Sequence, residues 1–262
     1  MEFLQHIDLL FVMSGFVVGA VVGLTGVGGG SLMTPILILV FGVHPAAAVG
    51  TDLLYASVTK TGGSLIHGLN RTIHWPLVAR LALGSVPAAL LTLLALQHYA
   101  GETAALGAMI SRALGFALIL TAATLIFRRW LVASYAERLA ALGEKRIGML
   151  TTMTGAALGL LVTLSSVGAG ALGVTALLLL YPKTPVARIV GSDIAHAVPL
   201  TLIAGAGHLM MGHIDVAMLA SLLLGSIPGI MLASNLAPRL PESVLRYALS
   251  TILVVVSAKL LA

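Results

Sequence analysis

The sequence predicts an all-α protein with about 8–10 membrane segments, built from two homologous helical repeats. Three observations predict this class. Of the 262 residues, 59% are hydrophobic and only 9% are charged, whereas an ordinary soluble domain carries roughly 25% charged residues. Long apolar segments alternate with short polar ones, and the two halves of the chain match each other. With a mean hydropathy of +1.08, the chain is expected to use lipid as much of its solvent.

The composition also excludes several classes of function. The net charge is +5, but the basic residues lie mostly in short loops between apolar segments, as they do in oriented membrane proteins, so no nucleic-acid partner is expected. The absence of cysteine excludes disulfides, thiolate metal sites and cysteine nucleophiles. No Lys or Arg precedes the first apolar segment, which is therefore interpreted as a mature span rather than a cleaved signal peptide.

Ten apolar segments are candidate helices. They are residues 7–24, 32–43, 46–67, 73–96, 106–127, 148–164, 170–181, 187–211, 214–236 and 244–261. Six or more approach the roughly 20 residues that a helix needs to cross a bilayer. Segments 32–43 and 170–181 would each rise only ~18 Å as helix. Both follow glycine clusters, so they are expected to be half-helices whose ends are buried in protein or face a cavity.

The basic residues predict the orientation. The longest polar stretch, 128–147, is expected to be a cytoplasmic linker between a first transmembrane repeat, 1–127, and a second, 148–262. If each glycine-entered segment is a separate crossing, Lys183 and Arg188 also lie inside and both termini lie outside. If each merges with the segment before it, these basic residues move mostly outside. The charge distribution favours the first count, and five crossings per half make the repeats inverted.

An internal duplication is indicated by uncommon residues that recur in register. Nine positions recur at an offset of 141 residues and six upstream positions at an offset of 140. The most informative matches are Gly-Thr-Asp ending at Asp52 with Gly-Ser-Asp ending at Asp193, and Gly84-Ser-Val-Pro with Gly225-Ser-Ile-Pro. Two such halves can rock about a central site and open it to either side of a membrane.

The glycine segments predict an anion site. A helix that starts after glycine offers free backbone N–H groups and a partial positive charge, and glycine lets an anion approach them. One such end from each half is expected to bind one small oxyanion near the membrane centre, with Lys60 as a counter-charge. The expected substrate-binding residues are Gly28, Gly29, Gly30, Ser31, Thr34, Ser165, Ser166, Gly168, Ala169, Gly170 and Lys60.

Structural interpretations stand beside these functional ones. Glycines allow close helix packing in membranes, which suits isolated ones such as Gly15. Lys60 is expected either to attract an anion or to pair with an aspartate. Asp52 and Asp193 are expected to carry a coupling proton or cation, or to bind the free N–H groups of a neighbouring helix end.

Histidines give a weaker signal. The repeat pairs His67 with His208, which are expected to act in coupling or gating or to be hydrogen-bonded structural residues. The cluster His208, Met210, Met211 and His213 straddles a turn, so no metal site is expected. No cofactor is expected either.

The residues that carry these arguments resemble one known family. The segment Gly19-Ala-Val-Val-Gly-Leu-Thr-Gly-Val-Gly-Gly-Gly-Ser, the Val49-Gly-Thr-Asp and Val190-Gly-Ser-Asp motifs and the repeated Gly-Ser-Val/Ile-Pro are similar to those of the sulfite exporter TauE/SafE permeases. The resemblance covers nearly the whole chain. It implies a multi-pass protein of the cytoplasmic membrane that moves sulfur-containing anions outward, using Gly28 to Ser31, Gly168 to Gly170, Asp52 and Asp193. The second half departs from the first at Ser166 and Ala169, which replace Gly26 and Gly29.

The sequence therefore predicts a secondary transporter for a small sulfur-containing oxyanion such as sulfite or an organosulfonate. The expected partners are the bilayer and the anion, and a homo-oligomer is compatible with the sequence. A cation or metal-ion transporter that uses the paired Asp and His residues is the alternative. An intramembrane enzyme would need a nucleophile with a base, or a metal motif, and the sequence shows neither.

Overall fold

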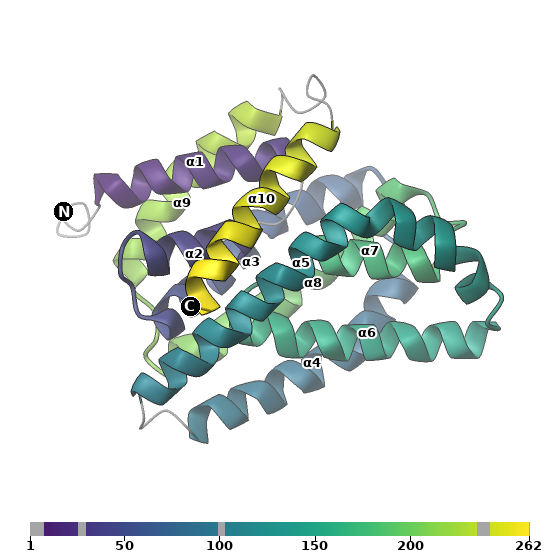
Figure 1. Ribbon diagram of the computed structural model, residues 1–262, viewed down its shortest axis with the longest axis horizontal. Helices are drawn as coiled ribbons and strands as arrows, with labels where there is room; N and C mark the ends of the chain where they lie inside the picture. The colour runs from purple at the N-terminus through teal and green to yellow at the C-terminus, as the bar shows by residue number, and fades with distance from the viewer. Residues whose placement is uncertain (1–7, 26–29, 99–102, 235–241, 262) are drawn as a thin grey trace.

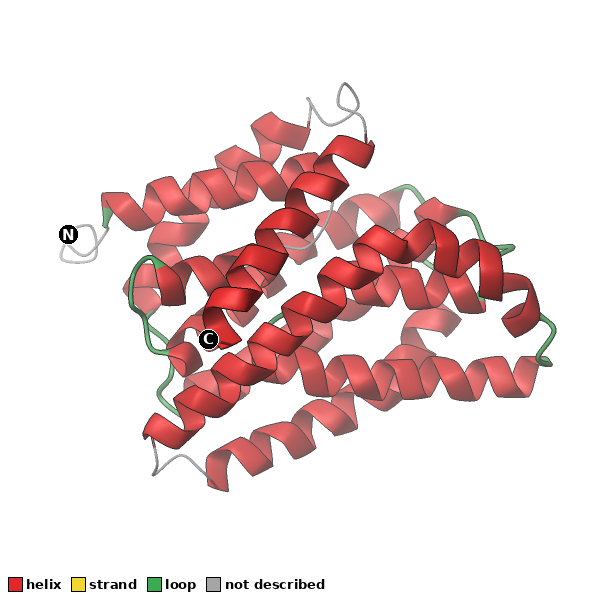
Figure 2. Cartoon of the chain, viewed as in Figure 1, coloured by secondary structure: helices red, strands yellow, loops and turns green. Residues whose placement is uncertain are grey.

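The computed structural model describes residues 8–25, 30–98, 103–234 and 242–261. The described residues form helices joined by loops, with no strand among them (Figure 2). The helices are α1 (Leu9–Thr25), α2 (Gly30–Leu39), α3 (Pro45–Leu69), α4 (Trp75–His98), α5 (Thr103–Ala140), α6 (Glu144–Ser165), α7 (Ala171–Leu180), α8 (Val186–Met210), α9 (Val216–Ser234) and α10 (Glu242–Leu261). The predicted all-α class is confirmed.

Each helix covers one of the ten predicted segments, but α5 is longer than the sequence analysis expected. It runs on from Phe127 to Ala140, through more than half of the expected linker 128–147. Residues 128–140 contain no glycine or proline and consist largely of Arg, Leu, Ala and Glu, which favour helix. Only the short turn around Gly143 separates α5 from α6.

Five described helices, α4, α5, α6, α8 and α9, are long and apolar enough to cross a membrane. Helix α3 has 25 residues but contains Asp52 and Lys60, which lower its hydropathy. The polar residues of its first half lie in the protein interior, since Thr51, Asp52 and Ser57 are buried. Helices α2 and α7 have ten residues each, and ten residues rise only ~15 Å, about half of a bilayer.

Helices α3 and α8 form an antiparallel pair in the interior. The start of α3 packs on the end of α8, where Gly50 lies against His208, and the start of α8 packs on the end of α3, where Gly191 lies against His67. Both helices have 25 residues, and their first residues, Pro45 and Val186, are separated by the offset of 141 that the sequence matches show. Lys60 lies close to the middle of this pair.

The outer helices make two matching crossings, each of which joins a helix of the first half to a helix of the second half. Helix α4 crosses α6, and α9 crosses α1, on opposite sides of the molecule (Figure 1). At the first crossing Gly84 lies against the carbonyl oxygen of Thr152, and at the second Gly225 lies against that of Val12. A side chain would overlap the neighbouring backbone at either position. Gly15 is also a packing glycine, because it lies against the backbone of Leu222.

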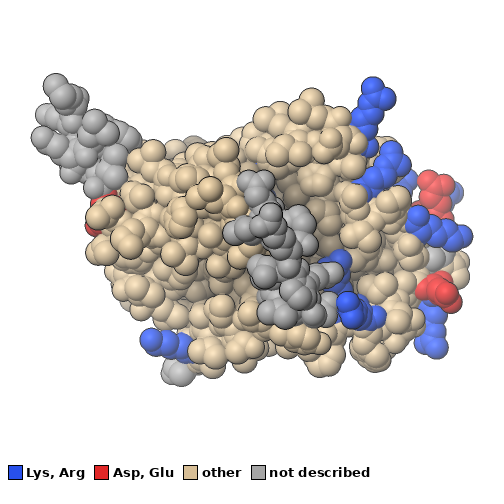
Figure 3. Space-filling model, turned by 90° about the horizontal axis from the view of Figure 1, so that it is seen from above, with Lys and Arg blue, Asp and Glu red and all other residues tan. Residues whose placement is uncertain are grey.

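One end of the molecule is basic. Most Lys and Arg side chains visible in Figure 3 gather at the end where α5 leads into α6. The loops α3–α4, α5–α6 and α7–α8 meet there, since His74, Glu144 and Thr184 line one pocket. These are the loops that the count of separate crossings assigns to the cytoplasmic side.

Candidate substrate site at the broken helices

The connection between α6 and α7 is a tight turn that requires glycine. Gly168 and Gly170 have φ values of +128° and +122°, which residues with side chains rarely adopt. Ser166, with φ of 59°, ends α6 in the left-handed conformation. The Ser165 hydroxyl donates to the carbonyl of Leu161 at 2.6 Å and accepts from the N–H of Val167 at 3.2 Å. Ser165 therefore stabilises the turn itself.

The turn places the start of α7 in the protein interior, where Ala169 and Ala171 are buried. Gly170 is the N-cap residue and has no side chain of its own to cap the helix. The first N–H groups of such a helix carry a partial positive charge. Chemically, this is a place for negatively charged oxygen atoms.

A carboxylate of the protein lies at this helix end. Asp193 of α8 is 1% exposed, its Oδ1 atom touches Gly173 in the first turn of α7, and the backbone N–H of Gly170 faces its carboxylate. Gly173 is needed here because any side chain would overlap Oδ1. Of the two interpretations of Asp193 from the sequence, this position fits the one in which the carboxylate binds free N–H groups at the end of a neighbouring helix.

Asp52 has the corresponding position in the first half. It is fully buried on α3 and accepts a hydrogen bond of 2.5 Å from the Thr34 hydroxyl of α2. Helix α2 begins at Gly30, and Ser31 in its first turn is buried. The predicted site residues Gly28 and Gly29 lie outside the described residues.

Lys60 connects the first half to the turn of the second half. Its Nζ atom donates to the carbonyl of Ala169 at 3.2 Å. Both Asp193 and Asp52 lie within electrostatic range of its charge, although within the described parts of the chain neither carboxylate comes within 4.0 Å of Nζ. Lys60 thus lies between two carboxylates without forming a contact ion pair with either.

These residues form what we call the central polar cluster: Asp52, Lys60, Ser166, Gly170 and Asp193. The Ser166 hydroxyl lies near the Asp52 carboxylate, so the cluster joins α3, α8 and the α6–α7 turn. Among the described residues, Oδ1 of Asp52, Oγ of Ser166 and Oδ1 of Asp193 are buried polar atoms without a hydrogen-bond partner. A buried polar atom without a partner costs about 1–3 kcal/mol, and a functional role or a bound water or ion can account for it. The cluster is therefore the best candidate for a solute site.

The two predicted histidines make defined contacts at the ends of the α3–α8 pair. His67 Nδ1 is 2.7 Å from the Thr72 hydroxyl, and His208 Nε2 is 3.1 Å from the carbonyl oxygen of Thr163. These hydrogen bonds fit the structural interpretation. A role in coupling or gating stays a prediction. In the described part of the chain, no group of three or more His, Asp and Glu side chains is arranged to hold a metal ion.

Sequence reasoning missed one pair of polar contacts near the cluster. The Tyr55 hydroxyl of α3 hydrogen-bonds to the Ser226 hydroxyl of α9. In the corresponding contact, His196 Nε2 of α8 is 2.7 Å from the Ser85 hydroxyl of α4, so both contacts join the two halves. Tyr55 and His196 are separated by the repeat offset of 141, as are Ser85 and Ser226. The repeat alignment could have found this pair, because the serines lie in the duplicated Gly-Ser-Val/Ile-Pro motif.

Comparison with known proteins decides the family. Residues 11–260 match the family described as Sulfite exporter TauE/SafE. The chain belongs to the TauE/SafE family. It is 40% identical over 253 residues to the Probable membrane transporter protein YjnA of Bacillus subtilis (strain 168), which covers 95% of this chain and 98% of the relative.

A second relative matches over a shorter part of the chain. The Probable membrane transporter protein YunE of Bacillus subtilis (strain 168) is 40% identical over 60 residues, or 23% of this chain and 22% of the relative. No solved structure matches the chain. Membership of the TauE/SafE family, together with the apolar helices, identifies the chain as a multi-pass membrane permease.

Proposed function

We propose that this TauE/SafE protein is a secondary transporter, without enzymatic activity, that exports a small sulfur-containing oxyanion across the cytoplasmic membrane. Sulfite and organosulfonates are the substrate class, in keeping with the description of the family. Transport proceeds by alternating access between the two halves. The central polar cluster is the transport site.

The position of Asp193 carries this proposal. Its carboxylate is itself an oxyanion, and it lies at the N-terminal end of α7 beside the Gly170 N–H. A sulfite or sulfonate group presents the same kind of negatively charged oxygen acceptor. Glycine at position 173 leaves room for a carboxylate oxygen at this helix end, since a side chain there would overlap Oδ1 of Asp193. An oxyanion can therefore replace the Asp193 carboxylate at this helix end.

The charges of the cluster imply coupling to a proton. Two aspartates and one lysine carry a formal charge of −1 when all are ionised, which repels an anion. A proton on Asp193 removes that charge and releases the carboxylate from α7. Lys60 then provides a positive charge for the incoming anion. Asp52 has the same role beside α2, so protonation of the two aspartates accompanies each exchange of substrate.

The α3–α8 pair supplies the moving part. Each end of the pair is closed by a glycine packed on a histidine, Gly191 on His67 at one end and Gly50 on His208 at the other. Because the two contacts occupy matching positions, opening one end while the other stays closed interconverts two similar arrangements. His67 and His208 are therefore the proposed gating residues.

A cation transporter is the second candidate, and one observation favours it. Within the part of the chain that the structure describes, Oδ1 of both Asp52 and Asp193 is buried without a hydrogen-bond partner. Carboxylate oxygens that are free to bind are ligands for a hard cation such as Na⁺ or Mg²⁺. Lys60 counts against this candidate because its positive charge lies within electrostatic range of both carboxylates.

Flux measurements in proteoliposomes separate the two candidates. Purified protein is reconstituted with radiolabelled sulfite inside, and efflux is followed with and without a pH gradient. For the anion transporter, we expect Lys60→Gln to reduce efflux at least about tenfold, the cost of losing one charge-assisted contact of about 1.4 kcal/mol or more. Lys145→Gln, which removes a positive charge far from the cluster, is the control and should leave efflux unchanged.

Asp193→Asn gives a second, independent result. The variant keeps the size of the side chain but cannot exchange a proton, so sulfite efflux should lose its dependence on the pH gradient. A flux of Na⁺ or Mg²⁺ that sulfite does not affect and that Asp193→Asn abolishes would establish the cation transporter instead. Absence of sulfite efflux from folded protein contradicts the anion proposal.

A further inference from the structure

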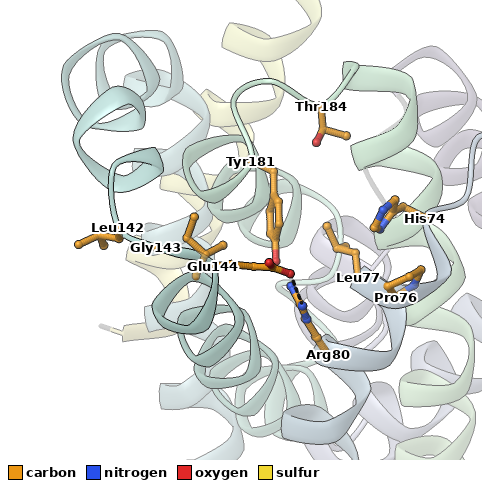
Figure 4. A pocket seen from close by; sticks show the side chains of 10 residues that line it. His74, Pro76, Leu77, Arg80, Leu142, Gly143, Glu144, Tyr181 and Thr184 are labelled. Carbon is orange, nitrogen blue, oxygen red and sulfur yellow. Dashed lines mark hydrogen bonds and ion pairs between the residues drawn. The ribbon is translucent and has the colours of Figure 1, made fainter.

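A pocket at the basic end of the molecule is separate from the central polar cluster. It has a volume of about 530 Å³ and lies where α4, α6 and α7 meet. Its polar lining comes from His74, Arg80, Glu144, Tyr181 and Thr184 (Figure 4). The volume is in the range of small-molecule sites and is ample for a sulfur oxyanion.

Arg80 is the cation of this pocket. Its guanidinium lies across Gly148 of α6, and its Nη2 atom is 3.3 Å from Oε1 of Glu144. The Tyr181 hydroxyl is directed toward the same place (Figure 4) and is held at 2.8 Å from the Thr151 hydroxyl. Thr151 donates its hydroxyl proton to the carbonyl of Ile147 at 2.8 Å, so the Tyr181 hydroxyl donates to Thr151 and its oxygen accepts from Arg80. The guanidinium is therefore the donor that suits an oxyanion.

The backbone around this pocket contributes dipoles of both signs. Helices α4, α6 and α8 begin beside it, at Trp75, Glu144 and Val186, while α7 ends there at Leu180 and α5 ends close by at Ala140. The positive and negative helix ends offset one another. The positive charge in the pocket lining therefore comes from Arg80.

Glu144 is the part of the pocket that an anion would replace. Its side chain is 87% exposed, whereas that of Arg80 is 37% exposed. An ion pair with so exposed a partner is weak, about 0–1 kcal/mol. An incoming oxyanion can therefore take the position of the Glu144 carboxylate on Arg80, and the displaced carboxylate is hydrated by the water that already surrounds it.

An apolar layer separates the pocket from the central polar cluster. Its six buried residues are Leu77, Leu81, Val174, Leu177, Leu178 and Ile189. Val174 lies one helical turn beyond Gly170, and Ile189 lies one turn before Asp193. The pocket and the cluster thus lie on opposite sides of one layer of hydrocarbon side chains.

We propose that the Arg80 pocket is an entry site that binds the sulfur oxyanion from the basic side before it passes to the central polar cluster. This inference rests on the proposed transport of an anion. It adds a second binding site, with Arg80 as the donor and Glu144 as the competitor that the substrate displaces.

Equilibrium binding of radiolabelled sulfite to the full-length protein in lipid nanodiscs tests the entry site without measuring transport. We expect Arg80→Gln to weaken binding at the entry site about tenfold, and Arg80→Lys to weaken it less because the charge is kept. Glu144→Gln should strengthen binding about threefold by removing the competitor. The matched control is Lys145→Gln, one residue from Glu144 but absent from the pocket lining, and it should bind as the parent protein does.

The outcomes separate this inference from the proposed function. Arg80→Gln protein that is folded by size-exclusion chromatography and binds sulfite as the parent does would overturn the entry site, even if efflux depends on Lys60. Arg80-dependent binding without any sulfite efflux would support the pocket and overturn the transport proposal.

Discussion

Two regions of this molecule have matching helices and different chemistry. At the basic end, α4, α6 and α7 surround a pocket that contains Arg80 and Tyr181. At the opposite end, the repeat offsets place Ser221 where Arg80 lies and Phe41 where Tyr181 lies. There the Ser221 hydroxyl accepts from the N–H of Asp8 at 3.2 Å, and the rings of Phe41 and Phe11 lie 4.7 Å apart.

The comparison separates the features that the two regions share from those in which they differ. Backbone packing is the same in both regions, because Gly84 and Gly225 make the same type of contact with a neighbouring carbonyl. The charged side chains differ, and they are the groups that an anion meets first. We infer that the common backbone packing supports the proposed alternating access, and that the charged side chains of one end set the direction of transport.

The largest effect is expected where the two regions are most alike. Gly84→Val and Gly225→Val each force a branched side chain into the backbone of the crossing helix, so each should destabilise the fold by at least about 3 kcal/mol. Fluorescence-detected size exclusion should show little folded protein for both. Gly62→Ala is the control, since nothing lies within 4 Å of its Cβ position. Collapse of one variant alone would show that the crossings are not equivalent.

Moving the lysine from position 60 to the corresponding position 201 tests whether the α3–α8 pair is symmetric. Lys60 corresponds to Thr201, which is buried on α8 near the middle of the pair. Lys60→Thr should reduce sulfite efflux at least about tenfold through loss of the counter-charge. Adding Thr201→Lys should restore part of that efflux if the halves are related by a two-fold axis. A double variant that is folded but no better than Lys60→Thr would contradict inverted repeats.

A smaller effect on stability is expected at the two hydrogen bonds Tyr55–Ser226 and His196–Ser85. Ser85→Ala leaves His196 Nε2 buried without its partner, at a cost of about 1–3 kcal/mol. Tyr55→Phe also removes one hydrogen bond but leaves only the small Ser226 hydroxyl unpaired, so it should cost about 1 kcal/mol. Thermal unfolding in detergent should therefore show a larger decrease in Tm for Ser85→Ala. The reverse order would mean that His196 is hydrated.

The smallest effect on stability is expected at the entry pocket. Glu144→Gln removes an exposed ion pair, so its Tm should change by no more than about 2 °C. The same variant is expected to bind sulfite more tightly. A decrease in Tm well beyond that limit would show that the Arg80–Glu144 pair holds α4 and α6 together rather than competing with a ligand.

Much of the fold could be predicted from the sequence because lipid imposes simple rules. Apolar length marked all ten helices, and the glycines before Ala171 marked the start of α7. The end of α5 was missed because the basic residues after Phe127 suggested a loop, although their helix propensity is high. Polarity alone does not end a helix.

The candidate site was harder to predict. Asp52, Asp193 and Lys60 stood out because ionisable residues are costly in lipid. Their partners did not, since the contact of Lys60 with Ala169 joins residues 109 positions apart. The role of Ser165 in the turn also depends on local backbone conformation. Tyr55 was overlooked because a tyrosine in an apolar segment resembles an ordinary packing residue.

The sequence by itself determined that the chain lies in a membrane, where its helices begin, and which residues of the two halves correspond. These properties depend on the hydropathy of each segment and on identical residues in the two halves, and both can be found by comparing residues along the chain. Only the tertiary structure decided that the Asp193 carboxylate lies at the start of α7, and that Arg80 opens to a pocket at one end while Phe41 and Phe11 fill the other. Charge and packing act through distance in space, which the order of residues along a chain does not specify.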